Sequence, residues 1–392
     1  MENEKYQVDM TKVAIIGTGA ISDSHINAYL KFGERCRIVA VVDLFAEKAR
    51  QKAEAYKLKA NVYSSVDELI EKEDFEAASI CLPPFEHASS SIKLLGRGKH
   101  VLVEKPMATS VEECDRMIEA AEKNNCLLGI VSQNRFRTPV MRLKRLIDEK
   151  VAGKVLLGQV ESLWWRGANY YDLWWRGTWD KEGGGCTINH AVHHIDMFLW
   201  MMGMPGAVSA ITANLNHTNS EVEDFSSAIL FYPGNIIGQI TASLIHHGEE
   251  QKLLFQCEDA SLAMPWRVCA YRQRENGFPE ENHEMIDKIQ GFYNSLPEVK
   301  NQGHDGQIEN FLNAIDGKEQ LLVDGVQGRN TVMLISAIYL SAHLGTTVEL
   351  PLAKDSVFYS REGIIENARR FHKKTKSVEN FSDTKITFGR QF

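Results

Sequence analysis

The sequence lacks the features that several protein classes require. Its most apolar window, residues 197–208, is far shorter than the roughly 20 residues that a membrane-spanning helix needs. The sequence has seven cysteines, an odd number, which argues against a disulfide framework. No two of them are spaced as CxxC, which argues against a zinc knuckle. Basic residues are not in excess: the net charge is −8, so nonspecific binding to nucleic acids or anionic lipids is not expected.

The two ends of the sequence also give no indication of secretion or of a macromolecular partner. The first ten residues, MENEKYQVDM, are charged and have no apolar core, so we expect no secretory signal and a cytoplasmic protein. The basic run ARRFHKKTK (residues 368–376) is typical of a solvated helix end, with a nucleic-acid patch as the alternative. We therefore expect a small-molecule partner, and neither nucleic acid nor a membrane.

The N-terminal third alternates short β-branched runs with helical patterns. The expected strands are residues 12–17, 37–43, 77–83, 100–104 and 126–131. Several helical segments between them open with Ser or Asp in the capping position. This alternation is typical of a doubly wound parallel sheet, so we predict an α/β domain over residues 1–131.

The remainder has longer alternating runs separated by Pro-Gly and Gly-Asn turns. The expected strands are residues 155–165, 207–216, 223–234, 235–247 and 252–264. Helices return at 304–317 and 324–345, and we expect the second to pack back on the first domain. We predict an α+β domain with a large, mostly antiparallel sheet over residues 132–350 and a C-terminal extension over 351–392. The large sheet also predicts a homo-oligomer, either a dimer or a tetramer.

The stretch KVAIIGTGAIS is a strand that runs into a glycine turn and then a helix. Gly17 permits the tight turn, and Gly19 lets the backbone approach a pyrophosphate. The helix expected to begin near Ala20 and Ile21 would direct free N–H groups at that charge. Ser22 replaces the third glycine of the pattern. Dinucleotide binding is favoured because the motif follows the first strand, and a structural turn is the alternative.

Asp43 ends the second expected strand, 43 − 17 = 26 residues after the first motif glycine. A carboxylate there would accept hydrogen bonds from the adenosine ribose and repel a 2′-phosphate. Leu44 and Phe45 follow, with no adjacent Arg or Lys to hold that phosphate. The sequence thus favours NAD over NADP, although a strand-end Asp is also a common helix cap.

Two further loops follow strands at the carboxyl edge of the sheet, where ligands bind in such folds. The loop CLPPFEHA contains Pro83 and His87, and the loop VEKPMA contains Glu104 and Lys105. We assign these four residues to the cofactor site. Lys105 would project into the crevice, although an ordinary surface lysine is the alternative.

These motifs together resemble the glucose–fructose oxidoreductase / inositol dehydrogenase / MocA (Gfo/Idh/MocA) family. GTGAIS, Asp43, PPFEHA, EKP, QNRF (residues 133–136) and GGGCTINHAVHHID (residues 183–196) occur in that family's order and spacing. The resemblance implies an N-terminal Rossmann domain, a C-terminal domain on a large sheet, and oxidation or reduction of a sugar or cyclitol hydroxyl with NAD(P). It runs from about residue 11 to 350.

The resemblance also implies catalytic roles. Lys105 matches the family's EKP lysine, which contacts the reacting hydroxyl, and His193 matches the proton-transfer histidine. Asn189 stands where the family pattern has an aspartate, so it adds no negative charge to orient His193. Independently of the resemblance, a histidine of pKa about 6.5 can take the hydroxyl proton near neutral pH. Asn189 and His193 are spaced i, i+4, so one helical face would present both.

The histidine-rich stretch permits other interpretations. His190, His193 and His194 with Asp196 would supply metal ligands, but His194 would point about 100° away from His193 on a helix. Hydride transfer with NAD needs no metal, so we predict none. A helix start with incidental histidines is the third interpretation. We assign Asn189, His190 and His193 to substrate binding.

The segment LWWRGANYYDLWWRGTW (residues 163–179) holds five of the seven tryptophans. Aromatic faces stack on sugar rings and arginine bonds hydroxyls, so we assign Arg176 and Trp179 to the substrate. Buried packing or a subunit interface is the alternative. The bulk of this segment suggests a sugar with a substituent, such as a glycoside.

Three functions remain in competition. The first is an NAD-dependent dehydrogenase acting on a CH–OH group of a sugar, sugar derivative, glycoside or inositol. The second is a glycoside-cleaving enzyme that uses NAD for a transient ring oxidation. The third is a non-catalytic sugar-sensing regulator, against which the presence of both Lys105 and His193 argues.

Overall fold

The computed structural model describes residues 10–381, and the chain divides into two compact units. Unit 1 contains residues up to Met107, together with Asp115–Gln133 and Asn301–Gly325. Unit 2 contains Ala108–Cys114, Asn134–Lys300 and the residues from Val326 onward. Within the described residues, the helices are too short or too polar to cross a lipid bilayer.

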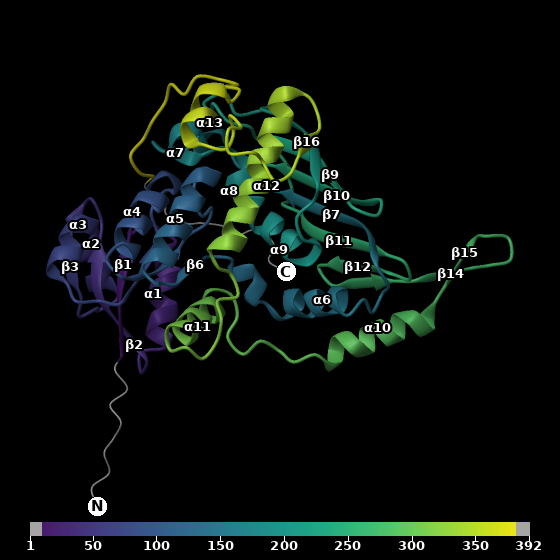
Figure 1. Ribbon diagram of the computed structural model, residues 1–392, viewed down its shortest axis with the longest axis horizontal. Helices are drawn as coiled ribbons and strands as arrows, with labels where there is room; N and C mark the ends of the chain where they lie inside the picture. The colour runs from purple at the N-terminus through teal and green to yellow at the C-terminus, as the bar shows by residue number, and fades with distance from the viewer. Residues whose placement is uncertain (1–9, 382–392) are drawn as a thin grey trace, which may run out of the picture. The chain divides into compact units, whose positions relative to one another are not determined.

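Unit 1 is built on a six-stranded parallel sheet (Figure 1). In spatial order its strands are β3 (Asn61–Tyr63), β2 (Cys36–Val42), β1 (Thr11–Ile16), β4 (Ala77–Ile80), β5 (His100–Val103) and β6 (Leu128–Ile130). The order 3-2-1-4-5-6 confirms the predicted doubly wound sheet. The sequence missed β3, since three residues are too few to show a periodic pattern.

The helices that accompany this sheet have the predicted amphipathic character. They are α1 (Ser22–Lys31), α2 (Ala46–Ala55), α3 (Val66–Lys72), η1 (Pro84–Glu86), α4 (His87–Leu95), α5 (Val111–Lys123) and α11 (His304–Ile315). The first residues of α5 lie in unit 2 and the rest in unit 1. Ser65 caps α3 by accepting a hydrogen bond from the amide of Glu68 at 3.1 Å.

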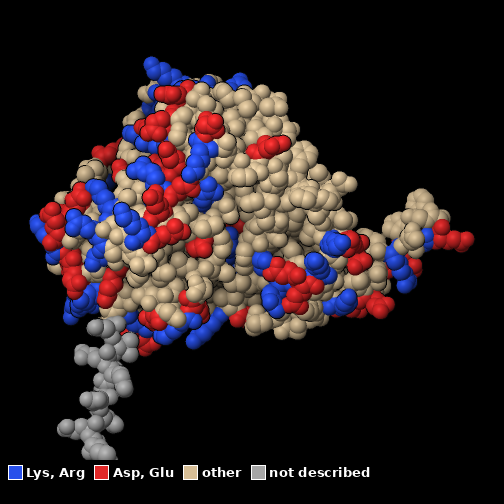
Figure 2. Space-filling view, viewed as in Figure 1, with Lys and Arg blue, Asp and Glu red and all other residues tan. Residues whose placement is uncertain are grey.

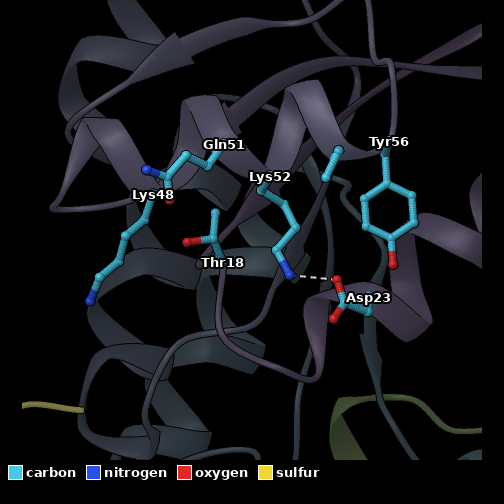
Figure 3. A pocket seen from close by; sticks show the side chains of 7 residues that line it. Thr18, Asp23, Lys48, Gln51, Lys52 and Tyr56 are labelled. Atoms are coloured by element: carbon cyan, nitrogen blue, oxygen red, sulfur yellow. Dashed lines mark hydrogen bonds and ion pairs between the residues drawn. The ribbon is translucent and has the colours of Figure 1, made fainter. Parts of the chain in front are cut away.

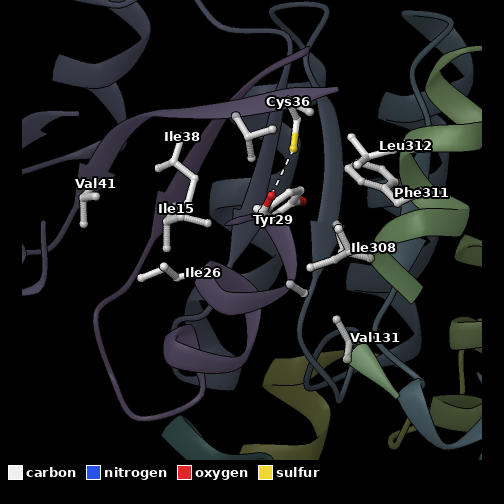
Figure 4. Close-up of a cluster of buried hydrophobic side chains, with 14 of the residues drawn as sticks. Ile15, Ile26, Tyr29, Cys36, Ile38, Val41, Val131, Ile308, Phe311 and Leu312 are labelled. Carbon is white, nitrogen blue, oxygen red and sulfur yellow. Dashed lines mark hydrogen bonds between the residues drawn. The ribbon is translucent and has the colours of Figure 1, made fainter. Parts of the chain in front are cut away.

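The α11 segment belongs to the core of unit 1. Ile308, Phe311 and Leu312 are about 1% exposed and pack in one cluster with Tyr29 and Val131 (Figure 4). This differs from the sequence-based domain boundaries, which placed α11 in the second domain. An amphipathic helix shows which of its faces is apolar but not which sheet that face covers. Chain order alone therefore misplaced this segment.

Unit 2 is built on an eight-stranded mixed sheet. In spatial order its strands are β13 (Arg267–Cys269), β12 (Ser261–Met264), β11 (Gln251–Cys257), β7 (Val155–Leu163), β10 (Ile236–Ser243), β9 (Phe225–Tyr232), β8 (Ala207–Ala213) and β16 (Val348–Glu349). Only the β7–β10 pair is parallel. This confirms the predicted large, mostly antiparallel sheet. A separate hairpin, β14 (Tyr271–Gln273) and β15 (Pro279–Glu281), extends from this unit (Figure 1).

One face of the large sheet is covered by helices. The helices of unit 2 are η2 (Gln133–Phe136), α6 (Thr138–Asp148), η3 (Ala168–Asp172), α7 (Trp179–Glu182), α8 (Cys186–Asn189), α9 (Val192–Met202), α10 (His283–Ser295), α12 (Gly325–Leu344) and α13 (Arg361–Asn367). Phe198 of α9 packs so closely on the sheet that a Cβ on Gly158 would lie 2.6 Å from its ring. The opposite face carries side chains that are only partly covered, including exposed Ile211, Ile229 and Phe231.

The position of α11 gives a stability prediction. Phe311→Ala should lower the free energy of unfolding by about 3–5 kcal/mol, because it leaves a cavity in the core of unit 1. Urea unfolding followed by far-UV circular dichroism measures this. Leu30→Ala is the control in the same unit, since Leu30 is 48% exposed and should change stability by less than about 0.5 kcal/mol. Equal effects of the two substitutions would contradict the placement of α11.

Candidate functional site

The turn after β1 has the geometry of a phosphate-binding loop. Gly17 has a φ of +93°, and a Cβ there would lie 2.6 Å from the carbonyl oxygen of Cys81. Only glycine satisfies both constraints. By contrast, a Cβ on Gly19 would meet no atom within 4 Å, so the backbone there is open. The turn therefore leaves the room that a pyrophosphate needs.

The helix after this turn begins at Ser22, and the expected start near Ala20 is corrected. The amide of Ser22 donates to the carbonyl of Gly19, and the amide of Ser24 to that of Ile21, both at 3.0 Å. The amides of Gly19, Ala20 and Ile21 thus precede the first helical hydrogen bond. At the positive end of a helix, such amides favour an anion.

Asp43 connects the end of β2 to the glycine turn. Its Oδ2 accepts hydrogen bonds from the amide of Thr18 at 3.0 Å and from the Thr18 hydroxyl at 2.6 Å. Its Oδ1 accepts from the amide of Phe45 at 3.0 Å, immediately before α2. Asp43 thus closes a turn just before α2, whose N-cap is Phe45 without a side-chain cap hydrogen bond, so the helix cap kept as an alternative is not observed. Each carboxylate oxygen has a further lone pair, so these hydrogen bonds do not exclude a ribose hydroxyl.

A cavity of about 520 Å³ lies beside the turn (Figure 3). It is lined by Thr18, Asp23, Lys48, Gln51, Lys52, Ala55 and Tyr56. The Lys52 ammonium pairs with Asp23, and the Lys48 ammonium lies 4.4 Å from the ring centre of Phe45. Two cations thus lie on α2 although none follows Asp43 directly. The predicted preference for NAD over NADP must rest on the Asp43 carboxylate, not on a lack of cations.

His87 connects the two loops at the carboxyl edge of the sheet. Its Nδ1 lies 2.7 Å from the carbonyl oxygen of Pro106, and its Nε2 lies 2.8 Å from that of Leu82. The side chain is buried, and burial lowers its pKa. Both ring nitrogens face backbone carbonyls, so His87 holds the loops together, and its assignment to cofactor contact remains a prediction. Pro83, in the same loop, is partly exposed.

Glu104 is also an internal residue of this edge. Its Oε1 lies 3.0 Å from Nε2 of His25 and 3.9 Å from Nε2 of His304, and its Oε2 accepts from the amide of Lys105 at 3.2 Å. Burial opposes ionisation, but the two imidazoles outweigh it and hold the pKa of Glu104 well below its usual range. Glu104 therefore positions the loop, and its expected contact with the cofactor remains a prediction. Lys105 is the one residue between Val101 and Val111 that is not fully buried.

The cluster of His25, Glu104 and His304 also has the spacing of metal ligands. One donor atom from each residue lies within 4.8 Å of the others. Among residues 10–381, no other group of His, Cys, Asp or Glu side chains has that geometry, and the histidine-rich stretch 183–196 does not form such a group. The 3.0 Å contact between His25 and Glu104 is that of a hydrogen bond. The prediction of no metal remains a prediction.

The glycine run before α8 wraps around a buried carboxylate. Glu223 accepts hydrogen bonds from the amides of Gly185 at 2.9 Å and Thr187 at 3.0 Å, and from the Tyr339 hydroxyl at 2.9 Å. A Cβ on Gly185 would lie 1.8 Å from the carbonyl oxygen of Glu223, and one on Gly184 would lie 2.3 Å from the Tyr339 hydroxyl. Gly185 and Gly184 must be glycine because the Glu223 backbone and the Tyr339 side chain, respectively, occupy the space that a Cβ would need.

Two residues of the following stretch reach the surface of unit 2. From Glu182 to Leu199, every residue is buried except Asn189 and His193. They do not share one continuous helix as the i, i+4 spacing predicted, because α8 ends at Asn189 and α9 starts at Val192. The Asn189 amide nitrogen donates to the carbonyls of Gly184 at 3.0 Å and Gly185 at 3.2 Å. The glycine run thus fixes the orientation of Asn189.

The neighbouring histidines are mostly buried. The Nδ1 of His194 lies 3.0 Å from the Ser162 hydroxyl, which also accepts from the Trp164 indole at 2.9 Å. Burial lowers the pKa of His194 to about 4, so its ring is neutral. His190 is 9% exposed, with its Nε2 at 3.4 Å from the Tyr170 hydroxyl. His190 therefore has little surface for the substrate contact assigned to it.

Asp196 has a structural role. It forms a buried bidentate pair with Arg135 of the QNRF motif, with Nε to Oδ2 at 2.8 Å and Nη2 to Oδ1 at 2.7 Å. This pair ties the start of η2 to α9. Because the carboxylate is committed to a guanidinium, Asp196 is not placed as a ligand for a metal.

The two residues assigned to the substrate in the aromatic segment differ in placement. Arg176 is partly exposed and pairs with Glu182, whose Oε1 lies 2.9 Å from its Nη1. Trp179 is 4% exposed, packs edge-on against Tyr339, and donates from its indole to the carbonyl of Arg369 at 3.1 Å. The environment of Trp179 is that of the buried-packing alternative, and its assignment to the substrate remains a prediction.

The basic run near the C-terminus packs on the same segment. Lys374 donates to the carbonyls of Tyr171 and Leu173, and Lys376 pairs with Asp172. The amide of Phe371 donates to the carbonyl of Glu221 at 3.0 Å. The run is therefore anchored on unit 2, while Arg369, Arg370 and Lys373 stay exposed, and the absence of a nucleic-acid partner remains a prediction.

Sequence reasoning missed the residues that organise both sites. Glu223, Tyr339 and His304 are far from the motifs in sequence, and no local pattern marks them. His25 lies three residues after Ser22 of the glycine motif, and that position was an available signal. Glu182 directly precedes the glycine run, and that position was an available signal. Its Oε2 accepts from the amide of Gly177 at 2.6 Å.

Comparison with known proteins identifies the class. Residues 11–132 match the oxidoreductase family with an NAD-binding Rossmann fold, and residues 140–263 match the GFO/IDH/MocA C-terminal domain. D-glucoside 3-dehydrogenase of Escherichia coli (strain K12) is 25% identical over 86% of this chain and 97% of its own length. 2,7-Anhydro-N-acetylneuraminate hydratase of Mediterraneibacter gnavus is 26% identical over 71% of this chain and 72% of its own.

A solved structure agrees with these matches. The WlbA dehydrogenase from Bordetella pertussis, in complex with NADH and UDP-GlcNAcA, has a TM-score of 0.75 at 26% identity, covering 88% of this chain and 100% of the other. Fold, glycine turn and comparisons together define an NAD-binding oxidoreductase of the sugar and inositol dehydrogenase type. The chain belongs to the Gfo/Idh/MocA family. The family, the fold class and the cofactor predicted from the sequence are confirmed.

The Glu182 environment gives a pH prediction. Burial raises the pKa of Glu182 from 4.5 to about 7, despite the nearby Arg176. Because the folded state binds this proton more tightly than the unfolded state, stability from this group falls as pH rises from about 4.5 to about 7. The difference between these two pKa values corresponds to about 3 kcal/mol of unfolding free energy.

Glu182→Gln removes this titration. The unfolding free energy of the variant minus that of the parent should therefore rise by up to about 3 kcal/mol between pH 5 and pH 8. Urea unfolding followed by tryptophan fluorescence measures it, because all seven tryptophans lie in unit 2. The exposed Glu275→Gln serves as the matched control. A pH-independent difference for Glu182→Gln would contradict the raised pKa.

Proposed function

We propose that the protein oxidises or reduces one secondary ring hydroxyl of a sugar, sugar derivative, glycoside or inositol, by hydride transfer with NAD. One observation carries the proposal: Lys105 and His193 each emerge from a stretch that is otherwise almost wholly buried. Buried backbone holds a side chain in place, and functional groups need that rigidity. The E. coli relative, named a D-glucoside 3-dehydrogenase, supports a sugar or glycoside as the substrate.

The cofactor supplies the hydride acceptor or donor when it is bound. The open backbone at Gly19 and the amides of Ala20 and Ile21 would hold its pyrophosphate, and Asp43 its adenosine ribose. Pro83 would line the same edge. These residues fit a dinucleotide because the turn has room for phosphates and the helix start has amides directed at them.

The protein residues handle the hydroxyl proton. In the oxidation direction, His193 accepts that proton as the carbonyl forms. The Lys105 ammonium stabilises the developing alkoxide. Asn189 binds a substrate hydroxyl and contributes no charge. In the reduction direction the same groups donate the proton.

A second candidate is a reaction in which NAD oxidises the ring only transiently, for example during glycoside cleavage. The similarity to a hydratase of 26% identity favours keeping it, since that relative is not named a dehydrogenase. Oxidation of one ring carbon acidifies its neighbour, so elimination becomes possible. Stoichiometry separates the two: the dehydrogenase accumulates NADH and the transient oxidation does not. A third candidate, a sugar-sensing regulator, would turn over nothing.

The proposal predicts the outcome of a substrate panel. Sugars, inositols and glycosides are incubated with NAD and the enzyme, and NADH is followed at 340 nm. Lys105→Ala and His193→Ala should each lower turnover by about 10²-fold or more while NADH still binds. Lys93→Ala and His283→Ala, both at exposed positions, are the controls. Near-normal rates in the first two variants would defeat the assignment.

We also propose a homo-oligomer formed through the open face of the large sheet. That face presents exposed Ile211, Ile229 and Phe231, next to partly covered Ile237 and Leu157. Figure 2 shows few charged side chains over the region of β9 and β10. Because its centre carries little charge, two copies of the face would meet without like-charge repulsion. The partner that fits it is therefore a second copy.

This proposal predicts a change in assembly. Ile229→Asp should shift the protein to monomers, because a carboxylate would be buried in each half of the interface. Light scattering after size-exclusion chromatography measures the mass, and NADH binding verifies the fold. Phe278→Asp, at an exposed apolar position on the β14–β15 hairpin, is the control. An unchanged mass in Ile229→Asp would exclude this face as the interface. The cytoplasmic location remains a prediction, which the seven free thiols support.

A further inference from the structure

The aromatic segment surrounds two arginines with rings. The Arg176 guanidinium lies 4.1 Å from the ring centres of both Tyr170 and Trp175. The Arg166 guanidinium lies 5.3 Å from the ring centre of Trp164 and 5.9 Å from that of Tyr170. We call these five residues the ring–arginine cluster.

This cluster borders the stretch that carries Asn189 and His193. The Tyr170 hydroxyl lies 3.4 Å from Nε2 of His190, and the ring centres of Trp164 and His190 are 5.8 Å apart. His190 directly follows Asn189 in the chain. The cluster therefore contacts the residue that lies between Asn189 and His193 in this stretch.

Both arginines of the cluster are neutralised by carboxylates. Arg166 pairs with Glu249, with Nη1 to Oε1 at 2.6 Å, and Arg176 pairs with Glu182 at 2.9 Å. The Glu182 side chain is 1% exposed, and its second oxygen accepts from the amide of Gly177 at 2.6 Å. Each pair has no net charge when its carboxylate is ionised.

The lysines behind the segment are also engaged. Lys374 donates to the carbonyls of Tyr171 and Leu173, the latter at 3.1 Å, and burial lowers its pKa. Lys376 pairs with the Asp172 carboxylate. Lys376 is thus neutralised by Asp172, whereas Lys374 keeps its positive charge and directs it at two backbone carbonyls, so the charge balance considered below is that of the two arginine pairs.

From this charge balance we propose that the ring–arginine cluster selects uncharged sugar rings and glycosides over sugars that carry a carboxylate or a diphosphate. The inference rests on the proposed function, because it takes the neighbouring Asn189 and His193 as the substrate site. Aromatic faces attract the C–H face of a neutral ring, and the N–H groups that remain on the arginines bond its hydroxyls.

An anionic substrate would have to compete with the existing carboxylates. Its negative group would meet arginines that already have partners, and it would be repelled by Glu182 and Glu249. Separating the Arg176–Glu182 pair would leave the buried Glu182 charge without its partner, and such uncompensated buried charges are strongly unfavourable. A neutral ring approaches the same surface without breaking either pair.

The test compares two glycosides that differ at one carbon. Methyl β-D-glucoside has a hydroxymethyl group where methyl β-D-glucuronide has a carboxylate. Binding of each to the protein–NADH complex is measured by tryptophan fluorescence at pH 8, and turnover of each with NAD at 340 nm. We expect the glucoside to bind at least tenfold more tightly than the glucuronide, and UDP-glucose to bind no better than the glucuronide.

The outcomes separate the inference from the proposed function. Equal or tighter binding of the glucuronide, or no binding of either glycoside, would overturn the inference. Turnover of the glucuronide alone would overturn it and leave hydride transfer to a ring hydroxyl standing. Selective binding of the glucoside, with no turnover of any member of the sugar and inositol panel, would support the inference and count against the proposed function.

A variant tests the cause of the selectivity. Glu249→Gln leaves the Arg166 charge without its partner, and should improve glucuronide binding relative to glucoside about tenfold. Glu280→Gln removes the partner of Arg272 in an exposed pair of the same unit and should leave the ratio unchanged. Both variants must bind NADH normally. An identical ratio in the two variants would show that charge pairing does not set the preference.

Discussion

The arrangement of the glycine run in unit 2 depends on the hydrogen bonds that the buried Glu223 carboxylate accepts. This carboxylate draws the amides of the glycine run toward itself, and Tyr339 of α12 completes its hydrogen bonding. The carbonyls of that run then point to Asn189 and hold its amide nitrogen. A carboxylate without these donors would be costly to bury. The conformation of the glycine run therefore depends on the segment before β9 that carries Glu223 and on α12, which carries Tyr339.

The same logic applies in unit 1 with different groups. Glu104 is held by His25 and by the amide of Lys105, and His87 joins the backbones of the two edge loops. The residues beside Lys105 are therefore fixed internally while its own side chain reaches the surface. In each unit, buried polar side chains organise the backbone, and one or two neighbours in the chain, those proposed to act on the substrate, are less buried than the residues around them. Because the surrounding backbone is held by buried hydrogen bonds, these less buried side chains start from fixed positions.

Much of the fold could be predicted from the sequence, because hydrophobic period and glycine placement are local signals. The doubly wound parallel character of the first sheet and the mostly antiparallel character of the second followed from such patterns. The features that the sequence did not predict have a common physical cause. Trp179 and His87 are exposed or buried according to distant partners, namely Tyr339 and the Pro106 carbonyl. Likewise α11 packs with α1 although about 270 residues separate them, and no local pattern encodes that.

The split composition of unit 1 has a consequence for biosynthesis. Its core includes Ile308, Phe311 and Leu312, so the cofactor-binding unit cannot complete its packing until the ribosome has translated past Asn301–Gly325. The aromatic segment likewise receives hydrogen bonds from Lys374 and Lys376, which are translated about 200 residues after it. A nascent chain therefore exposes incomplete apolar surfaces of both units at once, which makes assistance by chaperones during synthesis more important than for domains that finish in chain order.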